Sequence, residues 1–321
     1  MIAGTGGDCG KTAISLGLTA CWRNEGLAVA PFKKGPDYID AAWLSLAAGR
    51  KARNLDVWMM GVEGVLRAFA ANAIRGGINL VEGNRGLHDG EDARGTHSSA
   101  ALARLLGLPV VLIVPATKVT RTAAAVALGM KLLDPGLKIA GVLLNRLATS
   151  RQETIARSAI EAETGLPVLG AVPRVESCVL PGRHMGLVTP QEHTGAAEAI
   201  QTAGDIVRGS VDFKRIRAIA EAASLDALAV PGATEESPAG PEAVRDLRIG
   251  YFESAAFPFY YPENLEAIAG TGASKVAIDP LKDSELPQVD ALYIGGGFPE
   301  THAARLAANA SFRGSVALAA G

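Results

Sequence analysis

Apolar runs alternate with segments of helical periodicity along the first 230 residues of the chain. LPVVLIVPA (108–116) and KIAGVLLNR (138–146) are apolar at consecutive positions, which indicates strands buried on both faces of a parallel sheet. Right-handed crossovers through the intervening helices then give a doubly wound arrangement. The pattern predicts strands at 1–3, 27–31, 77–81, 108–116, 138–146 and 166–174, and helices at 12–25, 62–75, 96–106, 121–133 and 151–164. We therefore predict an α/β fold on a doubly wound, mostly parallel sheet.

A second, shorter α/β region follows a segment rich in proline, glycine, serine and glutamate. VPGATEESPAGPEA (230–243) has the composition of an interdomain linker. After it the pattern predicts strands at 247–252 and 274–278, a helix at 262–269, and a strand running into Gly295, Gly296 and Gly297. We predict a first domain at 1–229, a linker at 230–246 and a second domain at 247–321, in line with the roughly 100–200 residues of a typical domain.

Composition excludes several classes of partner. The net charge is −2 and no basic tract stands out, so we expect no nucleic-acid partner. The longest apolar run, 108–116, is far shorter than the ~20 residues of a membrane span. Cys9, Cys21 and Cys178 form no CxxC pair, which argues against zinc and fits a reducing cytoplasm, where we expect the protein to lie.

The stretch GTGGDCGKT (4–12) lies between the first strand and the first helix and is typical of a phosphate-binding loop. A glycine-rich turn at a helix N-terminus presents backbone N–H groups to an anion. Lys11 can neutralise phosphate charge, and the hydroxyl of Thr12 can ligate Mg²⁺. The backbone contributions to the cradle are expected from Thr5, Gly6, Gly7 and Gly10. The alternative, an incidental glycine-rich turn, fits the strand–helix context less well.

Two residues in this loop are unusual. Asp8 would repel a phosphate unless its carboxylate points outward or binds metal through water. A Cys9 thiolate would also oppose phosphate binding, so we expect Cys9 to be a small packing residue. Elsewhere, the five histidines show no metal-ligand spacing, and we expect Trp22, Trp43 and Trp58 to be packing residues.

Acidic residues follow two predicted strands, on the edge of the sheet where α/β proteins bind ligands. FKKGPDYIDAAW (32–43) contains Asp37 and Asp40, which can meet a metal or a substrate, and Lys33 and Lys34, which can hold anions. The alternative is a solvated polar loop. LVEGNRGLHDG (80–90) places Glu82 at a strand end, where it can hold Mg²⁺, with Asp89 seven residues later. The alternative there is a helix cap with a surface aspartate.

Together these motifs resemble those of the cobyrinate a,c-diamide synthase family, glutamine-dependent amidotransferases of corrin biosynthesis. The matching stretches keep the family's order over nearly the whole chain. They are GTGGDCGKT, FKKGPDYID, RNLDVWMM (53–60), VEGNRGLHDG, GVLLNR (141–146), LPVLGAVPR (166–174), LPGRHMGLV (180–188), FPFYYPENLE (257–266) and LYIGGGFPETHAARLAANASFR (292–313). The resemblance implies a dethiobiotin-synthetase-like P-loop domain and the first part of a class I glutamine amidotransferase-like domain.

The resemblance also implies a reaction and a set of site residues. ATP or GTP phosphorylates an acetate carboxylate of a tetrapyrrole, and ammonia from glutamine converts the acyl phosphate to an amide at the a and c side chains. Lys11, Asp37, Glu82 and Asp89 are implied as active-site residues, with Thr12 and Glu82 as Mg²⁺ ligands. Tyr38 and Ile39 are implied to place the substrate, and Asn145 to contact the nucleotide base. A homodimer is a further arrangement that we consider.

The glutaminase half departs from the family pattern. Gly295, Gly296 and Gly297 are candidates for its oxyanion loop, but the expected cysteine elbow and histidine are not present. We expect a truncated chain or a partner chain that supplies the remainder.

Other reactions stay open at this point. They are amidation of nickel-sirohydrochlorin or hydrogenobyrinate, a nucleotide switch of the partition-ATPase type, and an ATP-dependent carboxylase of the dethiobiotin type. The switch requires a lysine where this chain has Gly6, and the carboxylase leaves 247–321 without a role.

Overall fold

A computed structural model describes residues 1–175, 180, 182–183, 186–223 and 246–320. It divides into two compact units, Met1–Ala233 and Thr234–Gly321, which are described separately. The predicted linker at 230–246 falls almost entirely on residues 224–245, which lie outside the described part. The domain boundaries therefore stay a prediction.

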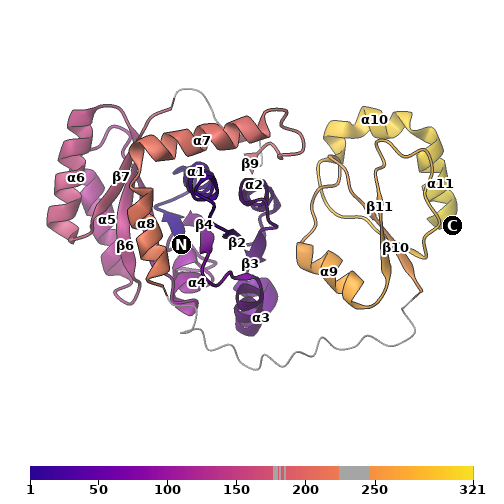
Figure 1. Ribbon diagram of the computed structural model, residues 1–321, viewed down its shortest axis with the longest axis horizontal. Helices are drawn as coiled ribbons and strands as arrows, with labels where there is room; N and C mark the ends of the chain where they lie inside the picture. The colour runs from indigo at the N-terminus through magenta and orange to yellow at the C-terminus, as the bar shows by residue number, and fades with distance from the viewer. Residues whose placement is uncertain (176–179, 181, 184–185, 224–245, 321) are drawn as a thin grey trace. The chain divides into compact units, whose positions relative to one another are not determined.

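The first unit is built on a seven-stranded sheet in the order β3-β2-β4-β1-β5-β6-β7 (Figure 1). Every neighbouring pair in it is parallel. The strands are β1 (Ile2–Gly4), β2 (Val29–Lys34), β3 (Arg53–Leu55), β4 (Ile78–Gly86), β5 (Val110–Pro115), β6 (Ile139–Leu147) and β7 (Val168–Pro173). This order places β1, and the loop that follows it, in the middle of the sheet.

Helices cover both faces of this sheet. They are α1 (Lys11–Asn24), α2 (Tyr38–Ala48), α3 (Val57–Asn72), α4 (Ser99–Leu105), α5 (Thr122–Leu133), α6 (Ser150–Thr164), α7 (Ala196–Ser210) and α8 (Phe213–Glu221). A short antiparallel pair, β8 (Gly182–Arg183) with β9 (Gly186–Leu187), precedes α7. The predicted α/β class and doubly wound parallel sheet are confirmed.

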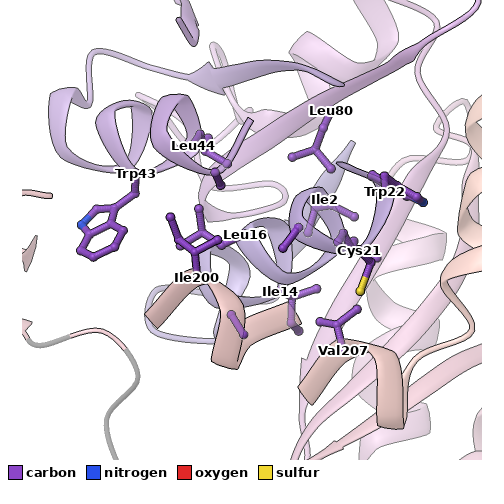
Figure 2. Close-up of a cluster of buried hydrophobic side chains, with 14 of the residues drawn as sticks. Ile2, Ile14, Leu16, Cys21, Trp22, Trp43, Leu44, Leu80, Ile200 and Val207 are labelled. Carbon is purple, nitrogen blue, oxygen red and sulfur yellow. The ribbon is translucent and has the colours of Figure 1, made fainter. Parts of the chain in front are cut away.

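One hydrophobic cluster fills the space between the sheet and α1, α2 and α7 (Figure 2). Ile14, Leu16 and Trp22 of α1 meet Ile200 and Val207 of α7 in it. The opposite face packs against α3, α4, α5 and α6 through separate clusters.

Close approach of α1 and α7 explains a glycine in each helix. A Cβ on Gly17 would overlap the carbonyl oxygen of Ala203, and one on Gly204 would lie 3.1 Å from the Cβ of Ala20. Glycine at these positions lets the two helices touch along their backbones.

Residues 38–55 differ most from the sequence prediction. Residues 38–48, part of a motif that could also have been a polar loop, form helix α2. The Asp37 side chain caps its N-terminus by accepting a hydrogen bond from the backbone N–H of Asp40 at 2.9 Å. The short edge strand β3 was not predicted, and β2 and β4 run three and five residues further than expected, to Lys34 and Gly86.

The prediction that all three tryptophans pack in the core was wrong for one of them. Trp22 and Trp43 are buried, but Trp58 is 71% exposed. Gly61, with φ 68° and ψ 172°, breaks α3 after its first turn. The turn that carries Trp58 therefore diverges from the part of α3 that buries Val65 and Phe69.

The second unit contains a three-stranded parallel sheet in the order β11-β10-β12. Its elements are β10 (Arg248–Phe252), α9 (Pro262–Gly270), β11 (Ser274–Ile278), β12 (Ala291–Tyr293), the 3₁₀ helix η3 (Pro299–His302), α10 (Ala303–Ala308) and α11 (Ala310–Ala320). Phe252, Ile278 and Phe312 form its buried centre. Across both units, none of the described helices has the length and apolar content needed to cross a bilayer.

Candidate active site at the carboxyl edge of the large sheet

The loop between β1 and α1 is held in shape by a neighbouring strand. Gly10, the N-cap of α1, has φ 91°, and a Cβ there would overlap Nδ2 of Asn145. The same Nδ2 donates to the carbonyl oxygen of Cys9 at 2.8 Å. Asn145, buried at the end of β6, thus supports the loop backbone instead of facing open solvent. Its predicted contact with a nucleotide base stays a prediction.

The two unusual loop residues take the positions that their chemistry requires. Cys9 is 1% exposed and packs in the core, as predicted. A Cβ on Gly4 would overlap the Cys9 sulfur, so glycine is needed at the end of β1. Asp8 is exposed with φ 50°, which fits the expectation of an outward-pointing carboxylate.

Lys11 closes the loop from inside. It is 8% exposed, and Nζ donates to the carbonyl oxygens of Gly6 at 2.9 Å and Arg85 at 2.7 Å. A Cβ on Gly6 or Gly7 would meet no atom within 4 Å. The ammonium therefore lies beneath a loop whose outer face has room for an anion.

A buried ion cluster lies directly beside the loop. Glu82 of β4 is fully buried, and its Oε1 accepts from Nζ of Lys33 at 2.7 Å and from Oγ1 of Thr12 at 3.0 Å. Lys33 of β2 also contacts Oδ2 of Asp40 at 2.6 Å. The cluster joins residues from α1, α2, β2 and β4. Oε2 of Glu82 is also buried, and the nearby hydroxyl of Ser15 lowers the pKa of this carboxyl.

Burial and the attraction between opposite charges together set the pKa values in this cluster. Burial raises the pKa of Glu82, and the nearby Lys33 charge opposes that rise only in part. Burial alone would lower the pKa of Lys33, but attraction to Glu82 and Asp40 outweighs it, so the net direction is upward. Burial and the charge of Asp40 likewise raise the pKa of Asp37. Lys33 therefore stays a cation beside Glu82.

The remaining predicted substrate residues lie at the start of α2. Asp37 caps the helix, and its carbonyl oxygen accepts from Nδ2 of Asn54 at 2.9 Å. Tyr38 and Ile39 form the first helical turn, and both are half-buried, with Ile39 against the core. Their roles stay predictions, although α2 holds Tyr38 and Ile39 next to Asp40 and hence next to the ion cluster.

Asp89 lies beyond β4 in the turn that returns toward the loop. Its exposed carboxylate accepts from the backbone N–H of Gly86 at 2.8 Å. The backbone N–H of Leu87 donates to the carbonyl oxygen of Gly4 at 2.7 Å. These contacts bring Asp89 to the same edge of the sheet as Lys11 and Glu82.

The candidate oxyanion glycines belong to the second unit. Gly295 follows β12, and its N–H donates to the hydroxyl of Tyr260 at 2.8 Å. A Cβ on Gly295 would lie 2.5 Å from the Tyr260 ring, and one on Gly297 would overlap the carbonyl oxygen of Ala256. Glycine is required here by close packing against 256–260. The oxyanion role stays a prediction.

Lys33 is the site residue that sequence reasoning left out of the active site. It was considered only as an anion holder, whereas the structure pairs it with Glu82 and Asp40. The available signal was its place near the end of an otherwise apolar strand, where a lysine must find a buried partner.

Comparison with known proteins extends these observations. Residues 1–188 match the family described as "CobQ/CobB/MinD/ParA nucleotide binding domain", and residues 248–321 match "CobB/CobQ-like glutamine amidotransferase domain".

Curated relatives match nearly the whole chain. It is 45% identical to the cobyrinate a,c-diamide synthase of Magnetococcus marinus, over 93% of this chain and 64% of the relative. It is 42% identical to that of Syntrophotalea carbinolica, over 99% of this chain and 68% of the relative. The chain is 40% identical to the cobyrinate a,c-diamide synthase of Archaeoglobus fulgidus, over 98% of this chain and 68% of the relative. The chain spans about two thirds of the length of these relatives, and it belongs to the cobyrinate a,c-diamide synthase family.

Proposed function

We propose that this chain carries the phosphoryl-transfer half of an ATP-dependent amidation of the a and c acetate carboxylates of cobyrinate. In the proposed reaction an oxygen of a substrate carboxylate attacks the terminal phosphorus of ATP, ADP leaves, and an acyl phosphate forms. Ammonia then displaces phosphate to give the amide, with glutamine as the ammonia source in the full-length enzyme. The observation that carries the proposal is the phosphate-binding loop with Lys11, Thr12 and the buried Glu82 cluster on one sheet edge.

Lys11 supplies positive charge where phosphate charge accumulates. Its ammonium donates to the carbonyl oxygens of Gly6 and Arg85 and lies 3.6 Å from the sulfur of Cys9. These are its hydrogen-bond partners among the described residues. These neutral partners can be exchanged for phosphate oxygens without separating an ion pair. Neutralising the transferred phosphoryl group is the main task of the protein in such reactions.

Thr12 and Glu82 fit a magnesium site. Both offer oxygen atoms, Oγ1 of Thr12 lies 3.0 Å from Oε1 of Glu82, and the second carboxylate oxygen of Glu82 is buried as well. Mg²⁺ commonly binds through one or two protein oxygen ligands together with water and phosphate oxygens. When bound, Mg²⁺ would withdraw charge from the phosphate oxygens. The Lys33 charge beside Glu82 lowers the pKa of that carboxyl and so opposes part of the rise that burial causes.

Phosphate release in the presence of a tetrapyrrole tests the proposal. The purified chain is given ATP, Mg²⁺ and ammonium chloride, with and without cobyrinate, so that the result does not depend on glutamine hydrolysis. We expect phosphate release that requires cobyrinate, together with an amide product detected by mass spectrometry. Hydrogenobyrinate and nickel-sirohydrochlorin are tested in parallel to define the substrate.

Two variants serve as controls for this assay. Lys11→Ala should lose the activity, while Lys51→Ala, a change at an exposed lysine outside the site, should keep it. ATP hydrolysis that no tetrapyrrole stimulates would overturn the proposal and favour a nucleotide switch.

A further inference from the structure

A cavity of about 280 Å³ adjoins the phosphate-binding loop at the carboxyl ends of β2 and β4. Lys34, Trp58, Arg85 and Asp89 are among the residues that line it. In parallel α/β sheets this edge is where ligands bind. The cavity is distinct from the loop itself, because neither Lys11 nor Thr12 lines it.

Two cations, Lys34 and Arg85, line this cavity. Within the described ranges, neither the Lys34 ammonium nor the Arg85 guanidinium forms an ion pair or a side-chain hydrogen bond. Burial lowers the pKa of Lys34, and the positive charges of Arg85 and Lys33 lower it further. The negative charge of Asp56 acts in the opposite direction and raises that pKa in part. Two neighbouring cations that repel each other favour an anion between them.

The acidic groups at the cavity already have partners. The carboxylate of Asp89 accepts from the N–H of Gly86 at 2.8 Å. Oε2 of Glu91 lies 3.0 Å from Nδ1 of His97. These two carboxylates thus already accept hydrogen bonds within the chain, whereas the side chains of Lys34 and Arg85 still have N–H groups that can donate to a ligand carboxylate.

An apolar surface adjoins the cavity. Trp58 lines it and is 71% exposed, and Met59 and Val62 nearby on α3 are 51% and 48% exposed. The volume lies below the roughly 300–1,000 Å³ of pockets that enclose a whole ligand. Such a site can take one carboxylate arm while a broad ring remains outside, against the tryptophan.

Arg85 connects the cavity with the phosphoryl-transfer site. Its carbonyl oxygen accepts from Nζ of Lys11 at 2.7 Å, while its side chain lines the cavity. A carboxylate held by this residue therefore lies beside the position at which Lys11 would hold phosphate.

We propose that this cavity is the tetrapyrrole subsite, in which Lys34 and Arg85 hold a peripheral carboxylate of the macrocycle and Trp58 stacks against its ring. The inference rests on the proposed function, and it assigns Lys34, which the sequence suggested only as an anion holder, to the tetrapyrrole together with Arg85 and Trp58. Charge-assisted contacts to a carboxylate and aromatic stacking each strengthen binding, so each of the three side chains should contribute to affinity.

Binding of cobyrinate to the nucleotide-free chain, measured by calorimetry, tests this assignment. We expect Lys34→Met, Arg85→Met and Trp58→Ala each to weaken cobyrinate binding about tenfold. Trp58→Phe, which keeps an aromatic ring, should retain most of the affinity. Arg67→Ala, on the exposed face of the same helix α3, is the matched control and should bind like the unchanged chain. ATP affinity should change less than about twofold in every variant.

The outcomes separate this inference from the proposed function. If the unchanged chain binds no tetrapyrrole, the proposed function itself is overturned. If it binds cobyrinate and the three variants bind equally well, only the subsite assignment is wrong. If the variants lose ATP affinity as strongly as cobyrinate affinity, the cavity holds nucleotide phosphate and the assignment is again overturned. Circular dichroism of each variant establishes that the fold is intact.

Discussion

Replacing Lys33 with methionine removes the cation that three elements share. The side chain of methionine has nearly the length of the lysine stem, so the change alters charge much more than volume. In the unchanged chain Lys33 contacts Glu82 at 2.7 Å and Asp40 at 2.6 Å. The variant leaves both carboxylates facing each other without a cation.

The structure indicates how large the effect should be. Lys33 is 1% exposed and Glu82 is fully buried, whereas Asp40 is 18% exposed and can still reach water. Most of the cost therefore falls on Glu82. Removing one partner of a buried ion pair destabilises a protein by about 3–5 kcal/mol. We expect the free energy of unfolding to fall by about this amount near neutral pH.

The deficit should depend on pH in a defined direction. Burial raises the pKa of Glu82, and Lys33 partly opposes this, so the variant should have a still higher pKa at Glu82. The penalty is fully present above that raised pKa. The stability penalty shrinks as the pH falls through the raised pKa of Glu82, because a protonated Glu82 needs no cation.

Urea denaturation at several pH values, followed by circular dichroism, measures the effect. The double variant Lys33→Met/Glu82→Gln removes both charges and should recover much of the lost stability, which a double-mutant cycle quantifies. Lys282→Met is the matched control, since that lysine is 77% exposed in an ion pair with Asp279, and it should cost less than about 1 kcal/mol. A loss in Lys33→Met as small as in this control, or one unchanged between neutral and acidic pH, would refute the reasoning.

Three further predictions concern the loop and the cap of α2. Lys11→Ala should lower tetrapyrrole-dependent phosphate release at least about 100-fold while leaving the melting temperature nearly unchanged; near-normal turnover would argue against the site. Gly10→Ala should destabilise the chain by about 1–3 kcal/mol and weaken ATP binding, because φ is 91° and the new Cβ would overlap Asn145; thermal melting and calorimetry measure both effects, and an unchanged affinity would contradict the loop geometry. Asp37→Ala should lose about 0.5–2 kcal/mol with the helix cap, whereas Asp37→Asn should keep the cap and lose activity. Equal activity in Asp37→Asn and the unchanged chain would show that Asp37 is only a cap.

The sequence predicts the strands of the large sheet because those strands are buried on both faces. Runs such as 108–116 have no polar face, and the structure places them within the parallel sheet. Helix α2 is less visible, since its apolar residues are spread around much of its circumference instead of along one stripe. Strand β3 has only three residues, too few to produce a periodic signal.

The ion cluster could not be derived from sequence because it depends on strand order. Lys33 and Glu82 lie directly opposite each other in the register of β2 with β4, although 49 residues separate them. Nothing in the local pattern of either strand shows that these two are neighbours. The exposure of Trp58 was missed for a similar reason, because it follows from the backbone angles at Gly61.

The packing of Cys9 gives the loop a built-in chemical reporter. The Cys9 sulfur is buried against Gly4 within the loop that we propose binds phosphate, and Cys21 is also buried. A thiol reagent can reach Cys9 only when the loop moves away from β1. The rate at which Cys9 is modified therefore measures how often the loop opens. With Cys21 and Cys178 replaced by alanine, the protection of this single thiol by nucleotide would measure how firmly the ligand closes the loop.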